Sequence, residues 1–357
     1  MVGGEGKRRP FVTIGVTTYN RHELLRQTLD SILAQTFSDF EVIVGNDYTE
    51  EVLTGEMLGI TDPRVRFVNH PRNLREVGNM NALLGMATGR YFTWQFDDDL
   101  YEPDFLLIAH EGLEKTGFPP AFFTSFRILI GGEKFRPQKV QSYTMREFTG
   151  REFLDWYSAF QTQVFSTYGL FETSVLKSTV GGFEELSTSA VGLYSEYLYL
   201  VKCALLDRIV YIDAPLYVFR QHEDSWSESN TDLENYRSTG QELIRRSSAV
   251  LLNPSLADDY AENLFKVCSL HLIEFAHKSG RHVNYISEHA RKKFGIKAVC
   301  RTIASHWRES FQVRKLYLSL GGDIGFRNRL VFMKVVLFCN YLMLSHLYHY
   351  FFGKKQA

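Results

Sequence analysis

The stretch Tyr91–Phe105, YFTWQFDDDLYEPDF, decides the fold of this chain. Its first six residues are apolar enough for a strand buried on both faces, and Glu102-Pro103 favours the start of a helix. Between them stand three adjacent carboxylates, Asp97–Asp99, which repel one another unless a cation lies among them. Open α/β sheets bind ligands at the carboxyl ends of such strands. The stretch therefore predicts a site for a hard divalent ion, Mg²⁺ or Mn²⁺, with an acidic surface turn as the alternative.

Strands and helices alternate on both sides of this stretch. We expect strands at 11–18, 40–44, 65–68, 91–96 and 121–130, and helices at 21–35, 78–87, 103–116 and 149–160. Further along, the pattern predicts a helix at 194–206, two short strands at 209–212 and 216–219, and helices from about residue 232. This spacing indicates an α/β fold with a mostly parallel, doubly wound sheet flanked by helices. We expect a polar tail at 1–10, an α/β domain at 11–230 and a mainly helical region at 231–357.

Composition and charge limit the kinds of partner and the cell compartment that we expect. The chain has 357 residues with 40 Lys or Arg and 41 Asp or Glu, so nothing in its overall charge suggests a nucleic-acid partner. The four cysteines are far apart and show neither metal-ligand spacing nor a disulfide framework. No signal peptide is visible at the amino terminus. We therefore expect a cytoplasmic protein.

The carboxyl-terminal region is basic and then apolar. Eleven Lys or Arg stand against three acidic residues between Arg281 and Arg329, and residues 330–352 are rich in apolar and aromatic side chains. Lys334, Asn340 and His346 interrupt that apolar segment, which makes a continuous membrane span unfavourable. The pattern suits peripheral contact with an anionic cytoplasmic membrane surface. Packing against the catalytic domain or a partner subunit is the equal alternative.

The order of several short motifs resembles family 2 glycosyltransferases with the GT-A fold, which is Rossmann-like. The resemblance covers roughly Phe11–Ser227 and rests on the order and spacing of short sequence blocks. These blocks are Val16–Arg21, Glu41–Asp47, Asn73–Asn81, Ala87–Tyr91, Asp97–Asp104, Gly181–Phe183, Ser195-Glu196 and Arg220–Ser225. It implies a nucleotide-sugar half at about 11–103 and an acceptor half at about 104–230.

The resemblance also implies roles for individual residues. It assigns to the donor and its nucleotide the residues Thr18, Tyr19, Asn20, Arg21, Asp47, Arg75, Asn81, Asp97 and Arg220. Asp98, Asp99 and His222 are the implied metal ligands. Alignment on Glu102-Pro103 makes Asp98 the principal ligand, whereas a direct DxD reading makes it Asp99, and both alternatives stay open. Phe96 stands where the family often has its first Asp.

The implied reaction is an inverting transfer of sugar from a nucleoside diphosphate sugar to an acceptor hydroxyl, with Mn²⁺ or Mg²⁺. A carboxylate base must take the proton of the acceptor hydroxyl, and Glu196 is the candidate. It stands in a Ser195-Glu196 pair, so only Glu196 occupies the acidic region of the family. The acceptor would be a saccharide or a lipid-linked molecule, as in polysaccharide, lipopolysaccharide or glycolipid synthesis at the cell envelope.

Two other functions remain as alternatives. A sugar-1-phosphate nucleotidyltransferase should carry a Gly-rich loop with Arg and Lys after the first strand, where this chain has Tyr19–His22. A non-catalytic binding or scaffold subunit could keep the same fold, and the departures at Phe96 and Ser195 leave that alternative open.

Overall fold

The computed structural model describes residues 9–131, 133–159, 169–188, 192–221, 232–290, 296–323 and 332–341, with backbone alone at 280–290 and 296–300. The chain divides into two compact units. The sheet unit comprises residues 1–185, 190–192 and 199–225, and the helical unit comprises 186–189, 193–198 and 226–357. The predicted boundary at 230/231 lies outside the described residues, so it stays a prediction.

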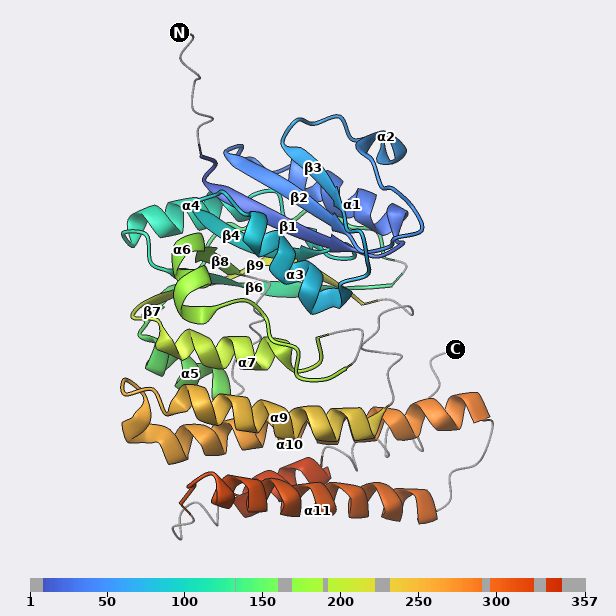
Figure 1. The fold of residues 1–357 in the computed structure, drawn as a ribbon, viewed down its shortest axis with the longest axis vertical. Coiled ribbons are helices and arrows are strands. Elements are labelled where there is room, and N and C mark those ends of the chain that lie inside the picture. The colour runs from blue at the N-terminus through green and yellow to red at the C-terminus, as the bar shows by residue number, and fades with distance from the viewer. Residues whose placement is uncertain are drawn as a thin grey trace. The chain divides into compact units, whose positions relative to one another are not determined.

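The sheet unit is built on a nine-stranded mixed sheet (Figure 1). Its strands are β1 (Val12–Thr18), β2 (Phe40–Asn46), β3 (Val65–Asn69), β4 (Tyr91–Phe96), β5 (Leu100–Tyr101), β6 (Ala121–Ile130), β7 (Met145–Phe148), β8 (Gly169–Glu172) and β9 (Ile209–Gln221). The order is β3-β2-β1-β4-β8-β6-β9-β5, with β7 paired to β9. Strands β1 to β4 are parallel to their neighbours among themselves, and β8 is antiparallel to both β4 and β6. The predicted α/β fold is confirmed.

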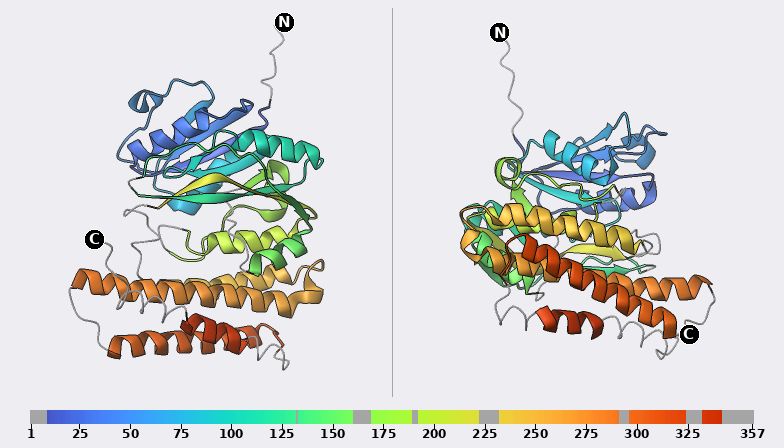
Figure 2. Two further views of the ribbon diagram at one scale, coloured as in Figure 1. Left: turned by 180° about the vertical axis from the view of Figure 1, so that it is seen from behind. Right: turned by 60° about the horizontal axis from the view of Figure 1, so that its bottom comes forward.

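Helices cover both faces of this sheet. They are α1 (His22–Leu33), α2 (Gly55–Leu58), α3 (Arg75–Met86), α4 (Phe105–Lys115), α5 (Gly150–Ser158), α6 (Thr173–Val175), the π-helix η2 (Leu176–Val180), α7 (Ser195–Lys202) and the 3₁₀ turn η3 (Cys203–Leu205). Helices α1 and α4 lie on one face and α3 on the other (Figures 1 and 2). Gly45 lets α3 approach β2 closely, because a Cβ there would lie 2.2 Å from Oδ1 of Asn79. The Asn79 amide donates to the Gly45 carbonyl at 2.8 Å.

The prediction of two separate strands at 209–212 and 216–219 is wrong. The segment forms one continuous strand, β9, which pairs with β6 along its whole length. Its register shifts on either side of Ser125, where Pro215 pairs. A proline cannot donate to a sheet ladder and is tolerated at such irregularities. The polar and proline residues between the apolar runs therefore mark a bulge and not a loop.

The helical unit contains α9 (Leu233–Leu251), the 3₁₀ turn η4 (Ala257–Asp259), α10 (Tyr260–Ala290), α11 (Ile296–Ser319) and a helical segment at 332–341. Asp232 caps α9 by accepting the backbone N–H groups of Glu234 and Asn235, each at 3.1 Å. Throughout the described ranges, no helix has both the length and the apolar character needed to cross a membrane.

Acid should weaken the helical unit through His306 of α11. Its side chain is fully buried, and burial lowers the pKa of His306 to about 4, against the opposing influence of the Leu272 backbone and the Glu309 charge. The unfolded chain therefore binds more protons than the folded chain between pH 6.5 and about 4. We expect His306 to contribute a fall of about 3 kcal/mol in the free energy of unfolding of the helical unit as pH drops through this window.

Urea denaturation at several pH values would measure this loss. A His306→Phe variant should lose the slope between pH 6.5 and 4, whereas His22→Gln, at a partly exposed histidine, should keep it. An unchanged slope in His306→Phe would show that other groups cause the acid sensitivity.

Candidate functional site

The acidic turn, Asp97–Asp99, lies at the carboxyl end of β4, next to the end of β1. The two strands are parallel, with Thr17 opposite Phe96. The loop that follows β1 therefore meets the loop that follows β4 at one edge of the sheet. This edge is where ligands bind in open α/β folds, and it collects most of the residues predicted for the site.

Asp97 is directed toward the loop after β1. Its carboxylate accepts a hydrogen bond from the Thr18 hydroxyl at 2.7 Å and pairs with the Arg21 guanidinium at 2.6 Å. Burial raises the pKa of Asp97 to about 6, although Arg21 and Thr18 favour its charged form. Asp97 therefore links the two loops and orients Arg21.

Asp99 is directed toward β9. Its two carboxylate oxygens accept the Tyr217 hydroxyl at 2.9 Å and the Arg220 backbone N–H at 2.8 Å. The side chain of Asp99 is fully enclosed, and burial together with the Asp98 charge raises its pKa well above the usual range. Both oxygens of Asp99 therefore accept hydrogen bonds from β9 and hold this strand against the acidic turn.

Asp98 is the most open carboxylate of the three. Its side chain is 18% exposed, against 0% for Asp97 and 1% for the Asp99 residue as a whole. One of its oxygens lies 2.8 Å from Arg21. Burial works against the charge of Arg21, but Asp97 and Asp98 outweigh it and raise the pKa of Arg21. Asp98 is thus more accessible than Asp99, and which of the two is the principal metal ligand stays a prediction.

Arg220 joins the same site from the end of β9. Its guanidinium donates to the Asp98 carbonyl and to the Gln27 side-chain oxygen. Burial lowers the pKa of Arg220, while the three carboxylates of the acidic turn act in the opposite direction. Arg21 and Arg220 thus place two guanidinium groups beside the acidic turn.

Thr28 of α1 is a site residue that the sequence did not indicate. Its hydroxyl lies 2.9 Å from the Asp97 carbonyl and 2.8 Å from the Asp99 carbonyl. The side chain is fully buried in α1, so it fixes the backbone of the acidic turn from beneath. A buried threonine among the apolar positions of a helix was the only available signal.

Glu76 of α3 was also missed. Its carboxylate accepts the Gly192 backbone N–H at 3.1 Å. Burial raises the pKa of Glu76, and the charge of Asp98 adds to this effect. Glu76 therefore belongs to the same electrostatic environment as the acidic turn.

The residues predicted to hold the nucleotide lie at the ends of β1 and β2. Tyr19 is 50% exposed, and its ring lies 5.4 Å from that of Tyr48. Asn20 has a positive φ of 51°, which turns the chain sharply before α1. Asp47 is buried and accepts the Leu74 backbone N–H at 2.6 Å.

Arg75 and Asn81 of α3 contact residues more than a hundred positions further along the chain, which the sequence did not predict. Arg75 pairs with Glu185 at 2.8 Å. The Asn81 amide exchanges two hydrogen bonds with the Phe183 backbone, at 2.9 and 3.0 Å. Gly182 makes room for this contact, because a Cβ there would lie 2.0 Å from the Asn81 oxygen. Their donor contacts stay predictions.

The contacts described above do not test the roles predicted for Glu196 and His222. Glu196 is the second residue of α7 and is partly buried. His222 lies outside the described residues. The roles of base and metal ligand stay predictions for both. Over the part of the chain with described side chains, no group of three or more His, Cys, Asp or Glu is arranged to hold a metal ion by itself.

The fold of this chain is similar to that of a solved protein structure. The structure of Staphylococcus aureus TarS 1–349 in complex with UDP-GlcNAc superposes with a TM-score of 0.58 at 16% identity, covering 97% of this chain and 93% of that one. At this level of identity the likeness concerns the fold. The sheet unit accordingly has the architecture of GT-A glycosyltransferases.

The sequence comparisons show a similarity to glycosyltransferases over the first half of the chain. The profile of Glycosyl transferase family 2 matches residues 13–170. An uncharacterized glycosyltransferase of Haemophilus influenzae is 27% identical over 35% of this chain and 39% of its own length. The succinoglycan biosynthesis protein ExoO of Rhizobium meliloti is 35% identical over 30% of this chain and 31% of its own. Over residues 13–170 the chain is therefore similar to family 2 glycosyltransferases. The matches span less than two fifths of these relatives.

Proposed function

We propose that this protein is an inverting glycosyltransferase that moves a sugar from a nucleoside diphosphate sugar to a hydroxyl of a saccharide or lipid-linked acceptor. The observation that carries the proposal is the meeting of Thr18, Arg21, Asp98 and Arg220 at the carboxyl ends of β1, β4 and β9. The family match at 13–170 covers the first three of these residues.

The donor diphosphate would lie against Arg21 and Arg220, and Asp98 would meet it through a divalent ion. Its charge rises as the bond to the sugar breaks, and two fixed guanidinium groups stabilise such charge where water is excluded. Tyr19 offers an exposed ring for the nucleobase, and Asp47 and Asn20 stand at the neighbouring strand ends. Glu196 is our candidate for the base that accepts the proton of the acceptor hydroxyl.

A divalent ion fits the donor set of this site. Mg²⁺ and Mn²⁺ prefer oxygen ligands and are often held by one or two carboxylates together with substrate phosphates. Asp98 is a partly exposed carboxylate and could supply that contact, with Asp97 beside it. Bound there, the ion would neutralise charge on the diphosphate. This arrangement requires no preformed three-residue cluster.

The names of two relatives suggest the pathway. One is the Rhizobium succinoglycan protein ExoO, and the other is a putative colanic acid biosynthesis glycosyl transferase of Escherichia coli. Both names concern the biosynthesis of a polysaccharide. We therefore propose that the acceptor is a growing polysaccharide unit.

Thermal shift of the full chain against UDP-, GDP- and dTDP-sugars, with Mn²⁺, Mg²⁺ or EDTA, tests the proposal. A specific donor should raise the apparent stability, since only the folded protein binds it, and the rise should depend on the ion. Hydrolysis of the same donor should follow. If a donor binds without any turnover, the protein is a binding subunit; if no donor binds, the proposed function is wrong.

We also propose that α11 contacts an anionic membrane surface. Its exposed residues include Trp307, Phe311 and Leu318, which recur on one face, while Arg308, Arg314 and Lys315 stand between them. The acidic residue with a described position in this helix, Glu309, is buried. Aromatic side chains interleaved with cations suit binding to acidic headgroups.

Sedimentation with vesicles tests this membrane contact. We expect the full chain to pellet with vesicles containing anionic lipid and to be released by salt, because surface charge attraction is screened. Trp307→Ser combined with Phe311→Ser should weaken binding at least tenfold, whereas Leu252→Ser, at another exposed apolar residue, should not. Equal binding to neutral vesicles, or self-association that the double variant abolishes, would contradict it.

A further inference from the structure

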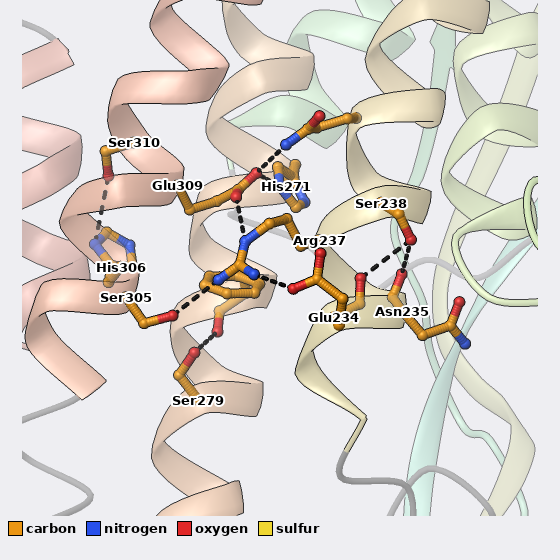
Figure 3. Close-up of polar contacts among 12 residues, drawn as sticks. Glu234, Asn235, Arg237, Ser238, His271, Ser279, Ser305, His306, Glu309 and Ser310 are labelled. Carbon is orange, nitrogen blue, oxygen red and sulfur yellow. Dashed lines mark hydrogen bonds and ion pairs between the residues drawn. The ribbon is translucent and has the colours of Figure 1, made fainter. Parts of the chain in front are cut away.

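The helical unit buries a charged network that the proposed chemistry does not use. Glu309 of α11 and His271 of α10 are both fully buried. The Glu309 carboxylate accepts from Arg237 at 2.8 Å and from Gln241 at 3.1 Å, and lies 3.1 Å from Nε2 of His271 (Figure 3). A buried carboxylate is costly unless such partners satisfy it. These contacts join α9, α10 and α11 at one point.

The contacts of His271 determine which of its two ring nitrogens can accept a hydrogen bond. Burial favours the neutral form of Glu309, but hydrogen bonds from His271 and Gln241 and the charge of Arg237 outweigh it and lower its pKa. A carboxylate only accepts, so Nε2 of His271 carries the proton. In the neutral imidazole Nδ1 is then the acceptor, and the Tyr194 hydroxyl lies 3.0 Å from it.

Tyr194 has a strained backbone and directly precedes helix α7. Its φ is +60°, in the left-handed region that non-glycine residues avoid, at a cost of about 1–2 kcal/mol. The residue is buried, and its ring meets those of Tyr236 and His271 with centroids 6.1 and 5.5 Å away. Ser195, the next residue, begins α7. Strain of this kind persists only where the surroundings enforce it.

A glycine in helix α9 makes room for the His271 ring and lowers the stability of the helix. Gly240 lies in the middle of α9, where glycine costs about 1 kcal/mol relative to alanine. A Cβ at this position would lie 1.9 Å from Nδ1 of His271. The glycine therefore makes room for the ring that receives the Tyr194 hydroxyl.

We propose that Glu309, His271 and Tyr194 form a relay that positions the start of α7 for catalysis. The proposal rests on the proposed function, because it takes Glu196 as the base. The relay holds Tyr194 in its left-handed conformation, and this conformation sets the direction in which α7 leaves. Glu196 lies two residues further on, so its backbone is fixed before substrate binds, which is a source of rate enhancement. His271 and Glu309 act as positioning residues.

A pair of tyrosine variants tests the relay in the full chain. Tyr194→Phe removes the hydroxyl that reaches His271, while Tyr197→Phe removes a hydroxyl that donates to Glu274 at 3.3 Å in the same unit. We expect Tyr194→Phe to lower kcat about tenfold with the donor KM within about twofold, since a buried acceptor loses its partner. Tyr197→Phe should keep kcat near the wild-type value.

A further variant and a second measurement separate positioning from simple destabilisation. His271→Gln should lower kcat as much as Tyr194→Phe, and the double variant should lose little more, because both break one chain of contacts. Hydrogen exchange at the amides of residues 194–198 should accelerate in Tyr194→Phe and not in Tyr197→Phe. Equal kcat and equal exchange in the two tyrosine variants would overturn the relay. No turnover by the wild-type protein would overturn the proposed function, and the exchange data would still decide whether Tyr194 anchors α7.

Discussion

Replacing Asp98 by Asn should lower kcat for sugar transfer by about a hundred- to a thousandfold while leaving the protein folded. Asp98 is the carboxylate of the acidic turn with an exposed side chain, and its removal deletes the charge that would meet the ion and the diphosphate. Its contact with Arg21 is partly exposed, so its loss should change the free energy of unfolding by less than about 1 kcal/mol. Steady-state kinetics and a thermal melt measure the two effects.

Asp104→Asn is the matched control for this prediction. Asp104 follows the acidic turn by five residues, precedes α4 and receives a hydrogen bond from Thr36 at 2.9 Å. It loses a carboxylate of the same kind close by in the sequence, and we expect transfer within about twofold of wild type. A similar loss of kcat in both variants would mean that overall charge, and not Asp98, matters. Full activity in Asp98→Asn would overturn the proposed donor site.

Replacing Glu309 by Ala should destabilise the helical unit by about 3–5 kcal/mol, because it leaves three partners, Arg237, Gln241 and His271, without their buried charge. The guanidinium of Arg237 and the ring of His271 both lose an acceptor, and neither site opens fully to water. Glu309→Gln keeps an acceptor oxygen and should cost less. Urea denaturation followed by circular dichroism would measure the difference.

Glu242→Ala provides the comparison on α9. Glu242 pairs with Arg246 at 2.8 Å on a more exposed surface, where such pairs contribute less than about 1 kcal/mol. A loss for Glu309→Ala no larger than that for Glu242→Ala would show that the buried network contributes specificity of packing but little stability.

The fold could be predicted because its central strands are continuous apolar runs. Tyr91–Phe96 reads as a strand buried on both faces, and the structure has it as β4 in the middle of the sheet. The antiparallel insertion of β8 could not be predicted in this way. Its four residues, Gly169–Glu172, carry no signal of direction, and their pairing with β4 depends on packing far along the chain.

The sequence could predict that several candidate residues lie together, but it could not predict their individual contacts. The ends of neighbouring parallel strands meet by geometry, which brings Thr18 and Arg21 to the acidic turn. The sequence could not separate Asp98 from Asp99, because the difference arises from Tyr217 and Arg220 on β9. The helical network escaped prediction for the same reason, since its polar residues lie on three separate helices.

The short pairing of β5 with β9 has a consequence for biosynthesis. Leu100 lies opposite Val218, so the acidic turn is braced by a segment that a ribosome adds more than a hundred residues later. The strands β1 to β4 can associate while the nascent chain is still growing, since they are contiguous in sequence. The carboxylates of the acidic turn acquire their full set of partners only after β9 has left the exit tunnel.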